Sequence, residues 1–432
     1  MKKKFIADLH IHSKYSRATS PHMDLPNLSK WAKIKGIDLL GTGDFTHHLW
    51  LDHLKSTLEP VDNGLFKYND VHFMLTVEIS SIYSKNGRCY RIHNLIFAPS
   101  FKTVDKINKT LSKIGNLHSD GRPILGLDAA KLARIVFDID PNCMLVPAHI
   151  WTPWFSLFGS KSGFDVLEDC FEDQAKNIYA LETGLSSDPA MNWRLSALDK
   201  YTLISNSDCH SPQKIGREAN VFNCELSYFE IMDVLKTKDK KRFLNTIEFF
   251  PEEGKYHFDG HRNCKVRFSP QQTKKNKGLC PVCGKSVTVG VTNRVEVLAD
   301  RPEGFVPENS IPFKNFIPLD EIISDALEVG KTSKRVIKAY DDAISKLGTE
   351  FDILMHKKEK ELFSALPEKI AEGILKVRRN ECVINPGFDG QYGTVSIFGK
   401  PKKARVDPEK PKKAINKKSA EVADNEKQLS FF

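Results

Sequence analysis

The first 220 or so residues are predicted to form an α/β fold built on a parallel sheet, either closed or open. Two observations favour this class. Short apolar runs of strand length alternate with stretches of helical character along this region. Residue types that bind metals also recur at or just after the ends of these runs, as expected where the carboxyl ends of parallel strands meet.

The predicted elements follow one another at short intervals. A short strand over residues 5–7 comes first, and a helix over residues 25–35 ends at Gly36, whose missing Cβ suits a helix C-cap. Residues 37–42 are apolar enough for a buried strand. Further strands are predicted near residues 72–77, 94–97, 144–147, 178–182 and 202–205.

The rest of the chain differs in composition. Residues 249–294 are polar and rich in Gly and Lys, and residues 383–393 have the pattern of a turn-rich hairpin. Helices are predicted over residues 319–329, 333–347 and 367–379. We therefore expect four segments: a catalytic domain over 1–222, a small module over 249–294, a helical region over 295–399 and a basic flexible tail over 400–432.

The net charge of +9 is concentrated near the C-terminus. Between Lys400 and Lys418, nine Lys and Arg residues accompany two acidic residues, and nine minus two gives +7 of the total. Such a run is often only a solvated, disordered segment. It also strengthens binding to a polyanion through the release of counterions.

Composition also bears on location. No run approaches the roughly 18 apolar residues that a membrane span needs. The basic start resembles a signal peptide, but Asp8 and His10 interrupt the apolar stretch behind it. We expect a cytoplasmic protein with no membrane association, in which the nine cysteines do not form a disulfide framework.

Two motifs in the first region have the form of metal-binding segments. His10 and His12 are two residues apart, so on an extended chain both imidazoles point to the same side. Asp208 and His210 repeat this spacing. Between the two motifs, three further side chains of metal-binding type follow predicted strands: Asp44, Glu78 and His149.

Together these seven side chains predict a multinuclear metal site. Mixed imidazole and carboxylate ligands suit Zn²⁺, Mn²⁺ or Fe²⁺. Clustered ions of this kind activate water and neutralise phosphate oxygens, so no serine or cysteine nucleophile is needed. The sequence therefore predicts a metal-dependent phosphoesterase.

The arrangement over about residues 3–220 resembles the polymerase-and-histidinol-phosphatase (PHP) superfamily. The resemblance implies a distorted seven-stranded β/α barrel that binds two or three divalent metals (Zn, Mn, Mg or Fe). Asp44 stands where this superfamily usually has a histidine after an aspartate, so Asp44 alone or Asp44 with His47 would fill that place. The ligands that the resemblance implies are His10, His12, Glu78, His93, His149, Asp208 and His210, with a purely strand-facing histidine as the alternative for His93.

A second metal site is predicted in the small module. His261 and Cys264 form an H-x₂-C pair, and Cys280 and Cys283 form a C-x₂-C pair fifteen residues later. Each pair has the spacing of a knuckle that offers two ligands to a tetrahedral zinc ion. His257 is the competing fourth ligand, and three free cysteines are the alternative reading. Four protein ligands would close the site, so we expect one structural zinc.

The order of these parts resembles the endonuclease Q family of DNA repair enzymes, over the chain to about Gly399. The similarity is concentrated in residues 8–15, 41–47, 254–264, 280–301 and 385–394. It implies cleavage of DNA on the 5′ side of a deaminated base (uracil, hypoxanthine or xanthine) or an abasic site. It also implies that damaged DNA is the partner, which residues 295–399 would help to bind.

Two other functions fit parts of the sequence. A PHP-type small-molecule phosphatase, of the histidinol-phosphate kind, would need only the first domain. A non-catalytic DNA- or clamp-binding scaffold would not need the full ligand set. For a nuclease that flips a base out of the duplex, Trp151, Trp154 and Phe155 are pocket candidates because they follow His149, although core packing explains them equally well.

The last five residues, Gln428–Phe432, are similar to the bacterial sliding-clamp-binding pentapeptide. Gln428 would hydrogen-bond in one subsite, while Leu429 and the two terminal phenylalanines would fill an apolar pocket. The eukaryal and archaeal clamp box fits less well, because Asn425 takes the place of its glutamine. A frayed hydrophobic end is the other alternative. We expect recruitment to the replication clamp and a nucleoid-associated location.

Overall fold

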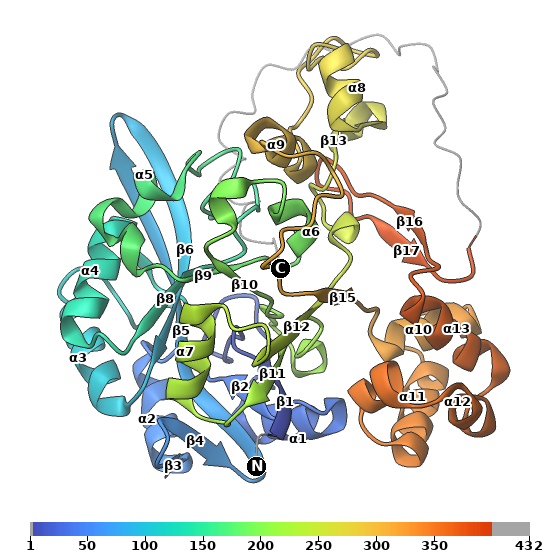
Figure 1. The fold of residues 1–432 in the computed structure, drawn as a ribbon, viewed down its shortest axis with the longest axis horizontal. Coiled ribbons are helices and arrows are strands. Elements are labelled where there is room, and N and C mark those ends of the chain that lie inside the picture. Colours follow the sequence, from blue (N-terminus) through green and yellow to red (C-terminus); the bar gives the residue numbers. More distant parts are fainter. Residues whose placement is uncertain (1–2, 400–432) are drawn as a thin grey trace.

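The computed structural model describes residues 3–399. The basic tail and the segment Gln428–Phe432 therefore lie outside the described residues. Figure 1 shows a large twisted sheet with helices along its outside, a small module drawn in yellow, and a helical bundle drawn in orange and red. Among residues 3–399, no helix has the length and apolar character to cross a membrane.

The central sheet has 11 strands and mixes parallel with antiparallel pairs. Its middle strands β1, β2 and β5 run parallel, as the sequence predicts, but the strands on either side pair antiparallel with them. The sheet is therefore not the fully parallel one that was expected. Its strands are β1 (Lys3–Asp8), β2 (Leu39–Gly41), β3 (Glu59–Val61), β4 (Leu65–Tyr68), β5 (Val71–Lys85), β6 (Arg88–Ala98), β7 (Ile124–Leu125), β8 (Met144–Pro147), β11 (Ala219–Cys224), β12 (Phe243–Glu248) and β15 (Phe313–Asn315).

A long hairpin explains much of this difference. β5 and β6 are joined by Asn86 and Gly87, both with positive φ (51° and 76°), the backbone of a two-residue hairpin turn. Such a turn forces the two strands to run antiparallel. The predicted strands at 72–77 and 94–97 are thus parts of longer strands whose hairpin projects from the body of the molecule (Figure 1).

The first helix and the predicted strands near residues 178–182 and 202–205 lie where the sequence places them, whereas the other helices of this region were not predicted individually. The first helix spans Leu25–Lys35, and Gly36 adopts φ 84° as its C-cap and donates its N–H to the Ala32 carbonyl. The other elements here are α2 (His48–Thr57), α3 (Phe101–Leu111), α4 (Ala129–Ile139), α5 (Leu167–Phe171), α6 (Pro189–Asn192) and α7 (Tyr228–Thr237), with a separate parallel pair β9 (Ala180–Glu182) and β10 (Thr202–Ile204).

One apolar cluster collects inward-facing side chains from the separate pair and from the central sheet. Its members include side chains from β1, β2, β5, β6, β8, β9 and β10, such as Ala7, Leu39, Met74, Phe97, Val146, Ala180 and Ile204, together with others from β4, β11, β12 and α7. The strand ends that follow these residues therefore meet above a common core, and this positions the side chains described in the next subsection.

The small module follows β12 and is closed by residues from the far C-terminus. It contains β13 (Asp259–His261), β14 (Val266–Phe268), α8 (Pro270–Lys275) and α9 (Val291–Leu298), and the late hairpin consists of β16 (Val383–Asn385) and β17 (Thr394–Ser396). In the hairpin loop, Gly387 donates its N–H to the Glu252 carbonyl at 2.8 Å and Gly393 donates to the Glu253 carbonyl at 3.0 Å. A Cβ at Gly393 would lie 2.1 Å from the Glu252 oxygen, so only glycine allows this approach.

The helical bundle contains α10 (Leu319–Leu327), α11 (Lys334–Leu347), α12 (Glu359–Ala365) and α13 (Glu368–Arg378). Three of these match predicted helices, while α12 was not predicted. A buried ion pair fastens the bundle to the first helix, because Lys35 Nζ lies 2.9 Å from Glu350 Oε2 and both side chains are 5% exposed. The Tyr340 hydroxyl donates to the same oxygen at 2.6 Å.

Candidate metal centre

Four predicted ligands, His10, His12, Glu78 and Asp208, converge in one buried group whose ligand atoms all lie within 4.8 Å of one another. His12 Nε2 is 3.0 Å from Asp208 Oδ1 and 3.3 Å from Glu78 Oε2. His10 Nε2 is 3.4 Å from the same Asp208 oxygen. His10 Nε2 and Asp208 Oδ2 are buried without a hydrogen-bond partner among the described residues, which suits atoms that bind a metal ion.

Glu78 also belongs to a second group, together with His93 and His149. Its Oε1 lies 2.6 Å from His93 Nδ1 and 3.0 Å from His149 Nε2, while its Oε2 faces the first group. Glu78 therefore bridges two adjoining sets of imidazole and carboxylate ligands. This donor set fits two neighbouring divalent ions of the Zn²⁺, Mn²⁺ or Fe²⁺ type.

The backbone holds these groups in an unusual conformation. Asp44, His149 and Asp208 follow strands β2, β8 and β10, and all three have positive φ, at 51°, 31° and 46°. For residues other than glycine, this conformation costs about 1–3 kcal/mol each and is typical of functional sites. The two histidine motifs also lie side by side, because the His12 N–H donates to the Cys209 carbonyl at 3.2 Å.

Two carboxylates support the histidines from behind. Asp44 Oδ1 lies 3.0 Å from His12 Nδ1, on the side of the ring that faces away from the first group. Glu182 Oε1 lies 3.0 Å from His10 Nδ1 in the same manner. Such contacts fix which ring nitrogen is free to bind a metal. Asp44 was expected as a ligand. It lies outside both ligand groups and contacts the ring of His12 from the opposite side.

Glu182 was missed by the sequence reasoning, although it ends the strand predicted at 178–182 and thus met the same criterion as the other candidates. It accepts a hydrogen bond from Asn206 Nδ2 at 2.9 Å and from the His149 N–H at 2.9 Å, in addition to its contact with His10. The position of this carboxylate at the end of a predicted strand could therefore have identified Glu182 as a residue of the site.

His210 and His47 lie outside the two groups. His210 is next to the first group, with its Nδ1 2.9 Å from the Asp208 carbonyl and its ring centre 4.7 Å from that of His12. His47 stacks on Tyr15 at 4.4 Å between ring centres. His210 is thus placed at the edge of the site, and His47 packs against an aromatic ring.

The electrostatics of the two groups differ. Burial lowers the pKa of His93 to about 4 in spite of the facing Glu78 carboxylate, so this ring is neutral at pH 7, the form that binds metals. Burial also acts to lower the pKa of His10, but Glu182, Asp208 and Glu78 outweigh it and raise the pKa well above its usual value. Carboxylates therefore surround His10 and favour a positive charge at this position, which is also an environment that favours a bound cation.

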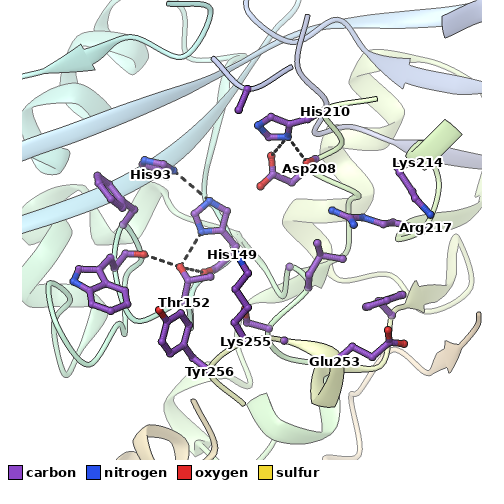
Figure 2. A pocket seen from close by; sticks show the side chains of 18 of the residues that line it. His93, His149, Thr152, Asp208, His210, Lys214, Arg217, Glu253, Lys255 and Tyr256 are labelled. Atoms are coloured by element: carbon purple, nitrogen blue, oxygen red, sulfur yellow. Dashed lines mark hydrogen bonds and ion pairs between the residues drawn. The ribbon is translucent and has the colours of Figure 1, made fainter. Parts of the chain in front are cut away.

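The metal centre forms one side of a cavity of about 500 Å³. Figure 2 shows His93 and His149 on one side, Asp208 and His210 above them, and Lys214 and Arg217 on the other side. The basic residues that line the cavity are Arg17, Arg122, Lys214, Arg217, Lys255 and Lys331, and its aromatic residues are Trp154, Phe155, Phe249, Tyr256 and Tyr392.

The three aromatic pocket candidates separate into two classes. Trp151 is fully buried and donates its indole N–H to Asn192 Oδ1 at 2.8 Å, so it belongs to the core. Trp154 and Phe155 line the cavity, and Trp154 packs edge-on against Tyr256 at 5.4 Å between ring centres. Tyr256 was not among the candidates, because it comes from the segment after β12.

The four predicted zinc ligands, His261, Cys264, Cys280 and Cys283, also meet, with their ligand atoms within 4.8 Å of one another. His261 Nδ1 lies 3.5 Å from Cys283 Sγ. His257 is outside this group and buried, and burial lowers its pKa to about 4. A group of three thiols and one imidazole fits a structural zinc ion.

Asp389, in the loop of the late hairpin, holds this module together. Its Oδ2 accepts a hydrogen bond from the Arg262 N–H at 2.6 Å, and its Oδ1 accepts one from the Thr288 hydroxyl at 2.7 Å. The same loop contacts Glu252, Glu253 and Lys255, and residues 253–255 line the cavity. The C-terminal hairpin therefore connects the cysteine group with the cavity wall.

Comparison with known proteins gives relatives over most of the chain. Residues 318–381 match a family model described as the MJ0043 C-terminal domain. The chain is 34% identical over 262 residues to the uncharacterized protein MJ0043 of Methanocaldococcus jannaschii, a match that covers 59% of this chain and 32% of that protein. It is 30% identical over 413 residues to the uncharacterized protein YqxK of Bacillus subtilis, covering 91% of this chain and 99% of YqxK.

Two solved structures share the fold along nearly their whole length. The lesion-specific endonuclease PfuEndoQ from Pyrococcus furiosus superposes with a TM-score of 0.82 at 32% identity, covering 91% of this chain and 95% of PfuEndoQ. A structure of endonuclease Q with a 27-mer duplex that has an abasic lesion at the active site gives a TM-score of 0.81 at 31% identity. That match covers 93% of this chain and 99% of the other.

Proposed function

The chain belongs to the endonuclease Q family, and from this membership we propose that it is a metal-dependent endonuclease of DNA repair. We propose further that it hydrolyses the phosphodiester on the 5′ side of a deaminated base (uracil, hypoxanthine or xanthine) or of an abasic site. The product would be a nick with a 3′-hydroxyl and a 5′-phosphate.

The observation that carries this proposal is the position of the two ligand groups. They share Glu78, and His93, His149 and Asp208 line a cavity that is also lined with basic and aromatic side chains. Divalent ions held by these residues would supply Lewis acidity toward a phosphate ester and its attacking water. We propose His10, His12, Glu78, His93, His149 and Asp208 as the ligands, with His210 at the edge of the site and Asp44 as support for His12.

The basic residues of the cavity would position the DNA backbone. Arg122 Nη1 donates to Glu78 Oε2 at 3.1 Å and lines the cavity, so it lies where a phosphate next to the ligands would be. Lys214 and Arg217 lie across the cavity from His93 and His149 (Figure 2). Contacts of this kind fix the register of a nucleic acid without reading its sequence.

The aromatic part of the cavity would receive the damaged nucleotide. A volume of about 500 Å³ falls in the range of sites that enclose small molecules. Rotating a base out of a duplex costs least when the base is mismatched or missing. Trp154, Phe155 and Tyr256 offer apolar faces for it, which supports a lesion-bearing duplex as the substrate over a small phosphomonoester.

We propose that β1, β2, β5, β6, β8, β9 and β10, whose side chains share one apolar cluster, form the seven-stranded PHP barrel. We retain 1–222, 249–294, 295–399 and 400–432 as the functional segments. The third of them would contribute to DNA binding and the second would hold one structural zinc.

The test is a nicking assay. The protein is incubated with Mn²⁺ and an end-labelled duplex that contains one uracil, hypoxanthine, xanthine or abasic site, with an undamaged duplex as control. A single nick 5′ of the lesion, with 3′-hydroxyl and 5′-phosphate ends, is the expected result. Hydrolysis of histidinol phosphate with no nicking of any damaged duplex would favour the small-molecule phosphatase instead.

The matched control is Asp208→Asn, which removes one ligand charge with almost no change of volume. This variant should fold normally and lose nicking. Wild-type activity in a folded, metal-loaded Asp208→Asn protein would contradict the assignment of the site.

We also propose that the segment Gln428–Phe432 binds a sliding clamp and that the protein works at the nucleoid. The support is the sequence similarity alone, because these residues lie outside the described part of the chain. The basic segment between Gly399 and Gln428 would connect such a peptide to the nuclease, so that binding to DNA and to a clamp could occur together.

A further inference from the structure

Two buried glutamates that are not part of the metal centre lie opposite each other on neighbouring strands. Glu248 ends β12, and Glu218 directly precedes β11. The antiparallel register pairs Ala219 with Ile247, so one step further it places Glu218 opposite Glu248. Opposed side chains in such a sheet have Cβ atoms about 4.5–5.5 Å apart. Both glutamates are fully buried.

Each glutamate has one oxygen that lacks a partner. Glu218 Oε2 and Glu248 Oε1 are buried and without a hydrogen bond to any described residue. Two carboxylate oxygens are both acceptors, so they bond to each other only when one of them carries a proton. Burial and the facing Glu248 carboxylate raise the pKa of Glu218 well above its usual value, and burial does the same for Glu248.

The charged groups that face the pair do not neutralise it. They are Glu182 from β9, Asp188 before α6 and Arg217 before β11. Two of these three are acidic. Arg217 uses its guanidinium for the Ser207 carbonyl, to which its Nε and Nη2 donate at 3.2 and 3.1 Å. The surroundings therefore favour a pair that carries one proton over two separate carboxylates.

The pair is connected to the metal centre by short contacts. Glu248 Oε2 lies 3.0 Å from the Thr183 hydroxyl and 3.1 Å from the Ser205 hydroxyl. Thr183 directly follows Glu182, whose carboxylate supports His10. Ser205 directly precedes Asn206, which donates to Glu182. Glu248 thus contacts Thr183 and Ser205 at the ends of β9 and β10. These two residues are adjacent in sequence to Glu182, which contacts His10, and to Asn206, which contacts Glu182.

The hydroxyl groups accommodate a protonated Glu248. Each hydroxyl has one proton, and each also has a backbone carbonyl within reach: Ile204 O at 3.2 Å for Thr183 and Ile247 O at 2.9 Å for Ser205. When the shared proton lies between Glu248 Oε1 and Glu218 Oε2, Glu248 Oε2 still accepts hydrogen bonds from these hydroxyls, and a hydroxyl that turns to its backbone carbonyl also remains satisfied. The contacts of Glu248 therefore remain satisfied when it is neutral.

We propose that Glu218 and Glu248 share a single proton and act together as a positioning pair for the metal centre. With the proton in place, the pair keeps the ends of β9 and β10, and through Glu182 the ring of His10, in their arrangement. When the proton is lost, two buried negative charges face each other and this support weakens. The effect on nicking rests on the proposed function, whereas the shared proton does not.

The first test measures the proton and stability without any activity assay. In infrared difference spectra of the full-length protein at pH 7.5, we expect the carbonyl band of a protonated carboxylic acid, lost in Glu248→Gln and in Glu218→Gln. Because the pKa values are raised in the fold, the unfolded chain releases this proton first, so stability falls as pH rises above about 4.3. The wild-type unfolding midpoint should therefore decline from pH 7 to pH 9 more steeply than that of either variant.

The second test uses the nicking rate. The protonated fraction of the pair falls about tenfold per pH unit above its pKa, so wild-type kcat should decline at high pH with little change in KM. Glu248→Gln should keep most of its pH 7 rate at pH 9. Glu225→Gln is the matched control, because Glu225 is exposed just after β11, and it should behave as wild type.

The outcomes separate the two claims. If neither glutamine variant alters the infrared band or the slope of stability with pH, the shared proton is wrong. If the band is present but the alkaline decline of kcat is identical in wild type and both variants, the positioning role is wrong. A protein that shows the band and yet nicks no damaged duplex would contradict the proposed function and leave the shared proton standing.

Discussion

Asp44 lies behind His12, with its Oδ1 3.0 Å from His12 Nδ1, while the other ring nitrogen of His12 faces Glu78 and Asp208. Its second oxygen accepts hydrogen bonds from the Ser13 N–H at 2.7 Å and from the Ser16 hydroxyl at 2.9 Å. Both oxygens of this carboxylate are therefore engaged, one of them with the ring of His12, a proposed metal ligand. The carboxylate orients His12 and fixes the nitrogen that carries the proton.

From this geometry we expect Asp44→Asn to weaken metal binding without abolishing it. Loss of a carboxylate that supports a metal-bound histidine typically reduces affinity about 10–100-fold. Calorimetric titration with Mn²⁺ measures the change, and Asp208→Asn, which removes a ligand itself, is the reference for a larger loss. If both substitutions removed the same amount of bound metal, Asp44 would be a direct ligand.

The cysteine group leads to a second prediction. Replacing Cys280 and Cys283 by Ser should release one zinc ion per chain and loosen residues 250–290, because structural zinc binding is itself folding free energy. Elemental analysis and hydrogen exchange measure these two effects, and DNA binding should weaken more than the chemical step. Cys89→Ser, at an exposed cysteine outside the group, is the control. Unchanged zinc content in the double variant would contradict the zinc site.

The buried pair of Lys35 and Glu350 gives a prediction on stability. Glu350→Gln leaves the Lys35 ammonium buried without its counter-charge, which typically costs about 3–5 kcal/mol. Denaturant unfolding at pH 7 measures this cost. Asp70→Asn, which breaks an exposed pair with Lys33, should leave the unfolding midpoint unchanged and serves as the control.

Glu350 should also make the free energy of unfolding depend on pH in the acidic range. Burial alone would raise the pKa of Glu350, but Lys35, the Tyr340 hydroxyl and the Leu319 N–H outweigh it and hold the pKa below its usual value. The stability that Glu350 contributes is therefore complete above about pH 4.3 and is lost as pH falls toward the lowered pKa. Unfolding curves between pH 3 and 6 should be steeper in pH for wild type than for Glu350→Gln.

The C-terminal pentapeptide gives the last prediction. Deleting residues 428–432 should abolish binding to a bacterial sliding clamp and leave nicking of short oligonucleotides unchanged, because the clamp contact is separate from the active site. Calorimetry with purified clamp measures the affinity. A deletion of residues 419–423, which shortens the tail but keeps the motif, is the control. Equal affinity with and without residues 428–432 would rule out the motif.

The sequence predicts elements well where one local rule decides. The helix at 25–35 ends at a glycine C-cap, and the strand at 144–147 is a short, fully apolar run, so both have the expected bounds. The direction of β5 and β6 was not predicted, although Asn86-Gly87 is a typical hairpin turn. It was overlooked because the apolar runs on either side were taken as separate parallel strands.

Residue types and spacing predict which residues lie near the site. They do not predict whether a residue belongs to a ligand group or supports one from outside it. Asp44 and Glu78 both follow strands, yet only Glu78 reaches the ligand groups. The two residues differ in their backbone. Asp44 lies in the loop after β2 with a positive φ, and its carboxylate contacts Ser13 and Ser16. The contribution of Tyr256 to the cavity was equally hidden, since it depends on contacts with residues more than 100 positions away.

The order in which the cavity wall appears during synthesis has a consequence for the cell. The proposed ligand residues are all present once the ribosome has passed position 210, but the wall also needs Lys255, Tyr256 and the hairpin glycines that follow residue 386. Since the Gly387 and Gly393 N–H groups donate to the carbonyls of Glu252 and Glu253, this part of the cavity wall has its full set of partners only after residue 393 has been made. If the proposed function holds, a nascent fragment that ends before this hairpin would lack part of the surface that contacts damaged DNA, so lesion recognition would follow the synthesis of residue 393.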